Sequence, residues 1–152
     1  EPWVIERMLL RGIDGLIVPR LDTAEQARAA LEVLRYCHPH DADDKLFVVQ
    51  IESAAAHANL DDFLAVDGID AHFIGPVDLS RSMGHRGDYA AAPVQAAVDD
   101  ILQRSRAAGR AVGTMVKPGD AEQWVARGAR FLYFHVNDWL RIGARSFPIA
   151  RG

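Results

Sequence analysis

Short, continuous runs of apolar residues alternate along the chain with longer stretches in which apolar positions recur every three or four residues. The continuous runs predict five β-strands, at 15–18, 46–49, 71–74, 111–116 and 131–134. The periodic stretches predict helices, at 23–36, 54–64, 93–108 and 119–127. Strands that are apolar on both faces and separated by helices are typical of a parallel sheet. The pattern therefore predicts an α/β protein built from repeated βα units.

The helix boundaries carry their own signals. Thr23 and Gln26 have the spacing of a capping box, and Gly109 and Gly128 follow two predicted helices as left-handed caps do. Residues 2–11 also predict a helix, so the pattern opens on a helix without a preceding strand. A closed (β/α)8 barrel needs at least about 200 residues. The five strands therefore predict either an open doubly wound sheet or the later part of a barrel whose first strands lie outside this sequence.

Composition narrows the function classes. The chain has 152 residues, of which 49% are hydrophobic and 25% charged, as expected for a single domain over residues 1–152. A net charge of -4 and a pI near 5.8 argue against nucleic acid as a partner. No apolar run is long enough for a membrane span, and the first residues lack the layout of a secretory signal. A lone cysteine, Cys37, excludes an internal disulfide and suits the cytoplasm.

Two carboxylates follow two neighbouring predicted strands. Glu52 comes directly after the run 47–51, and Asp78 follows the next strand through Gly75-Pro76-Val77. Because active sites of parallel α/β folds gather at the carboxyl ends of the strands, we expect both acids in one space. Carboxylate oxygens select Mg²⁺ or Mn²⁺, and such a metal with open positions can polarise a substrate carbonyl.

The residues around the two acids fit a small anionic ligand. Gly75 and Pro76 allow close approach of the backbone, and a helical turn starting near Asp78 would present free N–H groups to a carboxylate. Gln50 alternates with Ile51 and can share a face with Glu52. The alternative interpretation is that Glu52 and Asp78 only cap helices, and the pattern alone leaves the two interpretations level.

Five segments together resemble the HpcH/HpaI aldolase family: Val18-Pro19, Val49-Gln-Ile-Glu52, Val66-Asp-Gly-Ile-Asp70, Phe73-Ile-Gly-Pro-Val-Asp-Leu-Ser80 and Met83-Gly84. The resemblance runs from about residue 2 to residue 147. It implies a (β/α)8 TIM barrel of which this chain holds about five carboxyl-terminal βα units. It also implies a metal-dependent class II pyruvate aldolase, similar to 4-hydroxy-2-oxoheptanedioate aldolase, that cleaves a 4-hydroxy-2-oxo acid to pyruvate and an aldehyde.

The resemblance assigns residues by position. Glu52 and Asp78 match the two metal ligands of the family, for Mg²⁺ or Mn²⁺. Further residues match positions that contact or shape the substrate site: Gln50, Gly75, Pro76, Val77 and Met115. Gln50 matches a contact to the keto acid, and Val77 matches a backbone N–H donor to the pyruvate carboxylate. Family members assemble as trimers or hexamers, so the resemblance also implies a homo-oligomer.

The chain departs from the family pattern in its acid–base groups. The family's proton-relaying histidine and its arginine lie upstream of anything that matches Glu1, so no catalytic base is assigned, and Leu10 stands where many members have a supporting aspartate. Two alternatives stay open. One is a citrate lyase β-like enzyme acting on acyl-CoA, which a basic patch for CoA would favour. The other is a catalytically silent barrel segment that acts only in assembly.

Several other polar residues stand at predicted strand ends. Arg20 could attract an acidic substrate or pair with Asp22 on the surface. His85 and His135 could reach the mouth of the site, although loop histidines are more often only solvated. Lys117 prompts a Schiff-base alternative, but its position before Pro118-Gly119 favours an exposed side chain.

The remaining candidates are predicted to be structural. His72 lies inside a strand and is expected to be a hydrogen-bonded residue of the core or of an interface. Trp124, Trp139 and Phe147 are expected to pack in the core or between subunits.

Overall fold

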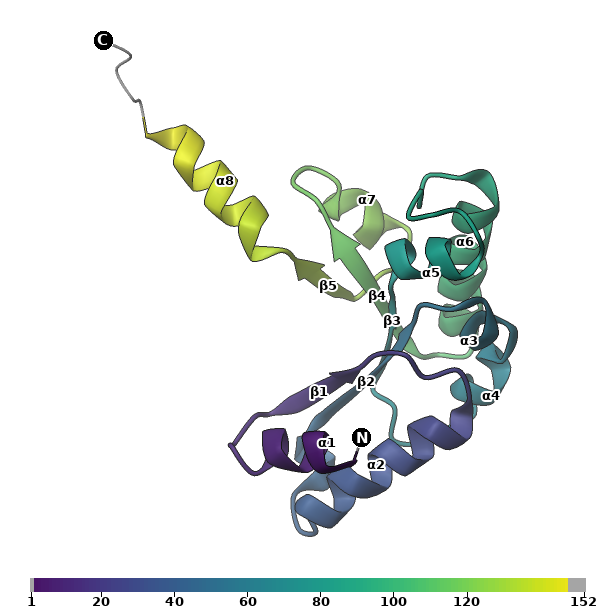
Figure 1. The fold of residues 1–152 in the computed structure, drawn as a ribbon, viewed down its shortest axis with the longest axis vertical. Coiled ribbons are helices and arrows are strands. Elements are labelled where there is room, and N and C mark those ends of the chain that lie inside the picture. The colour runs from purple at the N-terminus through teal and green to yellow at the C-terminus, as the bar shows by residue number, and fades with distance from the viewer. Residues whose placement is uncertain (1, 148–152) are drawn as a thin grey trace.

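The computed structural model describes residues 2–147 and contains one parallel sheet. Its strands lie side by side in chain order, as β1 (Gly15–Val18), β2 (Leu46–Ile51), β3 (Ala71–Ile74), β4 (Ala111–Val116) and β5 (Phe131–Phe134). Every strand predicted from the sequence is present, and β2 extends two residues further, to Ile51. The sheet curls, so that one side is hollow and the other is covered by helices (Figure 1).

The helices connect successive strands. They are α1 (Pro2–Leu9), α2 (Ala24–Cys37), η1 (Ala42–Asp44), α3 (Ala54–Ala58), α4 (Leu60–Leu64), α5 (Pro76–Ser82), α6 (Ala92–Ala107), α7 (Ala121–Ala126) and α8 (Val136–Ser146). The helix predicted over 54–64 is divided at Asn59, α5 begins at Pro76 close to the helical turn expected near Asp78, and α8 was not predicted. A doubly wound sheet reverses its strand order at a switch point, whereas this sheet runs from β1 to β5 without reversal. The architecture is therefore an open part of a βα barrel.

Local signals in the sequence determine the helix ends. The Thr23 hydroxyl accepts from the N–H of Gln26, and the Gln26 side chain accepts from the N–H of Thr23, which completes the predicted capping box of α2. Gly109 and Gly128 have φ values of 70° and 103°, so both adopt the left-handed conformation that ends their helices.

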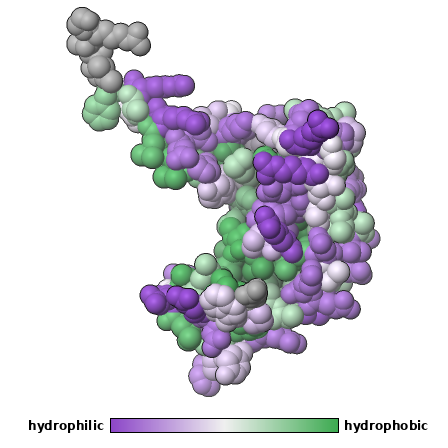
Figure 2. Space-filling view, in the orientation of Figure 1, coloured by the Kyte–Doolittle hydropathy of each residue, from purple (hydrophilic) through white to green (hydrophobic). Residues whose placement is uncertain are grey.

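The two faces of the sheet are buried in different ways. Phe47, Val49 and Ile51 of β2 point to the helices and are fully buried in the main core. The alternate residues, such as Val48 and Phe73, point to the hollow side and form a smaller cluster with inward-facing residues of β4 and β5. Figure 2 shows apolar surface gathered in this hollow. Burial on both faces explains why the central strands β2, β3 and β4 are apolar on both sides.

The aromatic residues predicted to be buried differ in their surroundings. Trp124 packs partly buried against the main core, with the guanidinium of Arg127 over its ring. Trp139 and Phe147 are 60% and 74% exposed, so they do not pack in the core of this chain, and their packing between subunits stays a prediction. The reason is that α8 points away from the sheet (Figure 1) and buries none of its residues.

Among residues 2–147, no helix has the length and hydropathy that crossing a membrane requires.

His72 is the polar residue of β3, and its side chain is buried. Its relative exposure is 0%, which confirms the core assignment. Neither ring nitrogen has a hydrogen-bond partner of good geometry, although the backbone of Phe63 lies near enough to raise the pKa of His72 slightly. Burial lowers the pKa of His72 from 6.5 to about 4, and the charge of Arg110 acts in the same direction.

Because of this buried histidine, we expect the folded protein to lose stability in acid. The unfolded chain binds the His72 proton more tightly than the folded chain, so stability falls as pH drops below 6.5 and levels off below about 4. Between pH 7 and pH 4.5 the free energy of unfolding should fall by about 2.5 kcal/mol through this residue, at about 1.4 kcal/mol per tenfold change in proton affinity.

Urea unfolding of the wild type and of His72→Leu at both pH values measures this effect. The leucine side chain is apolar and of similar size, and it carries no titrating group. The stability of His72→Leu should therefore depend less on pH than that of the wild type. Equal pH dependence in the two proteins would show that His72 is not the source.

Candidate active site

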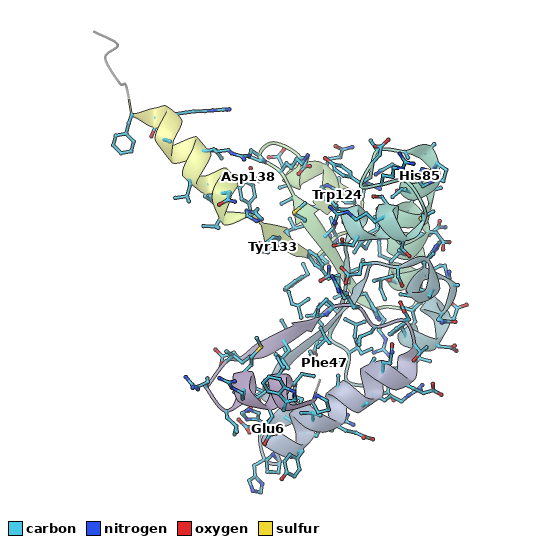
Figure 3. The ribbon with its side chains drawn as sticks, in the orientation of Figure 1. Glu6, Phe47, His85, Trp124, Tyr133 and Asp138 are labelled. Carbon is cyan, nitrogen blue, oxygen red and sulfur yellow. The ribbon has the colours of Figure 1, made fainter. Side chains whose placement is uncertain are left out.

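A pocket opens on the hollow side of the sheet, at the carboxyl ends of the strands. Its volume is about 320 Å³, and it is lined by Ile17, Gln50, Phe73, Gly75, Pro76, Val77, Asp78, Met115 and Tyr133. Tyr133 projects from the end of β5 toward the hollow (Figure 3). The strand ends therefore bring six of the seven residues assigned from the sequence to one pocket. The seventh, Glu52, contacts two of the lining residues.

Glu52 follows β2 directly and is nearly buried, with 7% relative exposure. The backbone N–H of Arg20 donates to its Oε1 at 2.8 Å, and the Gln50 side chain donates to its Oε2. Burial raises the pKa of the Glu52 carboxyl above its ordinary value. The nearby charge of Asp78 raises this pKa further, while the two hydrogen bonds and the Arg20 charge lower it.

The loop after β3 lies tightly against Glu52. The N–H of Gly75 donates to the carbonyl of Ile51 at 3.1 Å, which ties the loop to the end of β2. A Cβ atom on Gly75 would lie 2.8 Å from Gln50 Nε2 and 2.8 Å from Glu52 Cβ. Only glycine therefore allows this approach. Pro76 then begins α5, where a missing N–H costs nothing.

Asp78 lies in the first turn of α5 and is exposed. Its Oδ1 accepts from Arg81 Nη1 at 2.7 Å, in an ion pair whose side chains are 53% and 62% exposed. Such exposed pairs contribute little to stability, about 0–1 kcal/mol. The Asp78 carboxylate can thus exchange Arg81 for another cation at low cost.

The two carboxylates have the chemistry of a hard-cation site. Within residues 2–147, no group of three or more His, Cys, Asp or Glu side chains is placed to hold a metal. Two oxygen donors are nevertheless enough for Mg²⁺ or Mn²⁺, which keep several positions for water and substrate. Asp78 is near enough to raise the pKa of Glu52, and a divalent cation between the two acids would reverse this unfavourable interaction. The residues present therefore fit the metal that the sequence predicted.

The remaining predicted residues form the walls of the pocket. Gln50 is beside Glu52, and Met115 lies on the inward face of β4. The Ser80 hydroxyl donates to the Val77 carbonyl at 2.7 Å and holds the first turn of α5 in shape. The first N–H groups of a helix have no acceptor within the helix, so the N–H of Val77 can donate to a ligand. Sequence reasoning missed Ile17, Phe73 and Tyr133, because both faces of these strands are largely apolar and polarity alone does not mark the inward one.

Two other cations stand at the strand ends, and the prediction that Lys117 is exposed is confirmed. In the described part of the chain, the guanidinium of Arg20 forms no ion pair with Asp22. The hydrogen bond of Arg20 to the site comes from its backbone, while its charge acts on Glu52 without a direct bond. Lys117 is exposed and donates to the hydroxyl of Tyr89, with its ammonium 4.9 Å from the centre of that ring. The hydrogen bond to Tyr89 raises the pKa of Lys117, so the amine stays protonated. The structure thus gives Lys117 no feature of a Schiff-base nucleophile.

The two histidines near the strand ends do not line the pocket. His135 begins α8, where its Nδ1 accepts from the N–H of Asn137 at 3.1 Å, and its ring lies edge-on to Tyr133 at 6.1 Å. His85 lies far from Tyr133, beside α5 and α6 (Figure 3). Among the described residues, neither histidine therefore lies where it could act as a base beside Glu52 and Asp78.

Comparison with known proteins identifies the family of this chain. The sequence profile of the HpcH/HpaI aldolase/citrate lyase family matches residues 1–137. The chain belongs to this family. The structure also superposes on an HpcH/HpaI aldolase/citrate lyase family protein from Burkholderia cenocepacia, with a TM-score of 0.86 and 26% sequence identity. That superposition covers 95% of this chain and 67% of the other, so the HpcH/HpaI barrel assignment is confirmed.

Two curated relatives in the family are more similar in sequence. A hydroxypyruvate/pyruvate aldolase from Roseovarius nubinhibens is 37% identical over 138 residues, which cover 76% of this chain and 54% of the relative. A 4-hydroxy-2-oxovalerate aldolase from Rhodococcus jostii is 38% identical over 173 residues, covering 99% of this chain and 67% of the relative. The chain thus spans about half to two thirds of the length of these aldolases.

Proposed function

We propose that the complete protein is a divalent-metal-dependent aldolase that reversibly cleaves a 4-hydroxy-2-oxo acid to pyruvate and an aldehyde. The observation that carries this proposal is the small, largely apolar pocket at the strand ends, which is lined by Asp78 and by Gln50, the donor to Glu52. Family membership and the names of the two curated relatives support the same reaction class.

Each residue of the site has a role in this proposal. Glu52 and Asp78 hold Mg²⁺ or Mn²⁺, which supplies a Lewis acid for the keto oxygen of the substrate. Gln50, next to Glu52, orients the keto acid end by hydrogen bonding. The N–H of Val77 binds the carboxylate of pyruvate, and Gly75 and Pro76 set the position of that N–H group.

The apolar wall suits the small pyruvyl part of the substrate. Met115 lies against the inward cluster with Phe73, and Ile17 and Tyr133 are on the same pocket. These side chains exclude water from the reacting carbon atoms, which strengthens the charge interactions at the two carboxylates. The wall offers no charged group for the aldehyde half.

We propose that the general base and any other group that transfers protons come from outside this chain. Ile17 and Tyr133 on the hollow side are each 42% exposed, and this surface suits cover by further strands of a closed barrel. We propose that a different part of the complete protein, or a neighbouring subunit, supplies both that cover and the base. A cytoplasmic homo-oligomer, trimeric or hexameric, is part of this proposal, and the exposed apolar side chains of α8 support contact with another subunit.

An acyl-CoA lyase activity, as in citrate lyase, is the alternative within the family. CoA carries several phosphates, so such an enzyme needs cationic side chains at the mouth of the site. The residues that line the pocket include Asp78 and no lysine or arginine, and Arg81 beside the lining is already paired with Asp78. This lining favours the aldolase.

Metal-dependent release of pyruvate by the complete protein tests the proposal. Protein treated with a chelator should lose cleavage of 4-hydroxy-2-oxo acids, and Mn²⁺ or Mg²⁺ should restore it. Lys117→Ala is the matched control. A Schiff-base enzyme would lose all activity in this variant. A metal enzyme should keep its activity within about twofold, since surface changes away from the chemistry have small effects. Cleavage that survives complete metal removal would disprove the proposal, and metal-dependent turnover of acyl-CoA substrates alone would favour the lyase.

A further inference from the structure

The loop after β1 contains an unusual backbone conformation. Arg20 has a φ of 57°, in the left-handed region that favours glycine. Apart from the glycines, Arg20 and Arg86 are the only residues in the described part of the chain that have a positive φ. Strained residues of this kind persist where the surrounding structure holds them, and they are frequent at functional sites.

The left-handed conformation directs one N–H group to the site. The backbone N–H of Arg20 donates to Glu52 Oε1 at 2.8 Å, from a position 32 residues earlier in the chain. Glu52 is 7% exposed, so this carboxylate has little water to satisfy it. The bond is therefore a main support of a buried charge, and charge-assisted bonds of this type are stronger than neutral ones.

The two oxygens of Glu52 have different surroundings. Oε1 is taken by the N–H of Arg20, while Oε2 accepts from Gln50 and faces the loop after β3. A Cβ on Gly75 would lie 3.0 Å from Oε2, so this oxygen is next to the loop that leads to Asp78. A backbone N–H cannot swing away as a side chain can. The N–H of Arg20 thus fixes the rotation of the carboxylate.

We propose that Arg20 is a positioning residue for the metal site, acting through its backbone. Its left-handed conformation holds Glu52 Oε1 and leaves Oε2 as the oxygen presented toward Asp78. The effect of Arg20 on metal binding rests on the proposed metal function, whereas its hydrogen bond to Glu52 does not. The guanidinium is not required for this role, because only the N–H and the φ angle are used.

Substitutions that change the backbone preference at residue 20 test the proposal in the complete protein. Arg20→Gly keeps the N–H and favours the left-handed region, whereas Arg20→Val disfavours that region because the side chain is β-branched. Loss of a group that orients a metal ligand typically weakens metal binding by about 10-fold to 100-fold. We expect the Kd for Mn²⁺, measured by calorimetric titration, to rise by about that factor in Arg20→Val and to stay within about twofold in Arg20→Gly.

Arg86→Val is the matched control. It removes the same charge and imposes the same strain at a left-handed residue, in a loop that contributes nothing to the pocket lining. Both valine substitutions should lower the unfolding temperature, but only Arg20→Val should bind Mn²⁺ more weakly. Equal Mn²⁺ affinity in Arg20→Val and Arg20→Gly would overturn the proposal, as would equal weakening in Arg86→Val.

Amide hydrogen exchange separates this inference from the metal function. Without metal, the amide of residue 20 should exchange more slowly in the wild type than in Glu52→Ala, by on the order of tenfold, because the hydrogen bond protects it. If the protein binds no Mn²⁺ but this protection is present, the proposed function fails and the hydrogen bond stands. If the amide exchanges equally fast in both proteins, the positioning role of Arg20 is refuted.

Discussion

Replacing Asp78 by asparagine in the complete protein is expected to reduce metal-dependent pyruvate formation by about 100-fold to 1000-fold. The substitution removes one of the two proposed metal donors, and a bound Lewis acid contributes several kcal/mol at about 1.4 kcal/mol per factor of ten in rate. The fold should survive, because Asp78 is exposed and its ion pair with Arg81 contributes at most about 1 kcal/mol. Kinetics with saturating Mn²⁺ and calorimetric titration of the metal measure the two effects.

Arg81→Ala is the control for this prediction. It breaks the same ion pair at 2.7 Å but leaves the Asp78 carboxylate in place. Its activity should stay within about fivefold of the wild type, the range that an exposed pair allows. If Asp78→Asn and Arg81→Ala reduce activity equally, the ion pair is what matters and Asp78 is not a metal ligand.

Glu52→Gln should separate stability from metal binding at the same site. The amide oxygen can still accept from the N–H of Arg20, and a buried charge with a raised pKa is removed. Thermal unfolding should therefore occur at an equal or higher temperature, while Mn²⁺ binding is lost. A variant that binds Mn²⁺ as well as the wild type would exclude Glu52 from the metal site.

Gly113→Ala is expected to have the largest effect on folding. A Cβ on Gly113 would lie 1.7 Å from the carbonyl oxygen of Phe131, an overlap with the backbone of the neighbouring strand. The strands β4 and β5 would have to separate, and the ring of Phe131, edge-on to Phe73 at 6.0 Å, would be displaced. The cost should be at least about 3 kcal/mol, the upper part of the usual range for overpacking.

Chemical unfolding of Gly113→Ala and Gly143→Ala measures this cost against a matched change. Gly143 lies in α8, where a Cβ would meet no atom within 4 Å. Alanine there should leave stability unchanged or raise it by up to about 1 kcal/mol, since alanine is the better helix former. If Gly113→Ala is as stable as Gly143→Ala, β4 and β5 can adjust without cost.

The strands were predictable because their signal is local and strong. All five apolar runs became strands, since parallel strands are buried on both faces and need no long-range information to recognise. The helix over 54–64 was predicted as one piece, yet it divides at Asn59. The helix over 136–146 was missed although its apolar residues Val136, Trp139 and Leu140 recur at helical spacing.

The site was predictable only in part. Strand ends and spacing placed Glu52 and Asp78 together, because parallel strands with right-handed crossovers bring successive carboxyl ends to one edge. The role of Arg20 could not be read in the same way. Its contact with Glu52 comes from a backbone N–H, and any residue type except proline carries that group. Its arginine side chain instead suggested a substrate-binding or surface charge.

The sequence by itself determined the succession of strands and helices, the family and the two acids that follow adjacent strands. These features depend on side-chain polarity and spacing, which are local properties of the chain. Only the tertiary structure decided that Glu52 is buried, that Gly75 leaves room for it, and that Arg20 turns its N–H to the carboxylate. Burial, close approach and backbone direction arise from segments that meet across the sheet, so they exist only once the strands have been brought side by side.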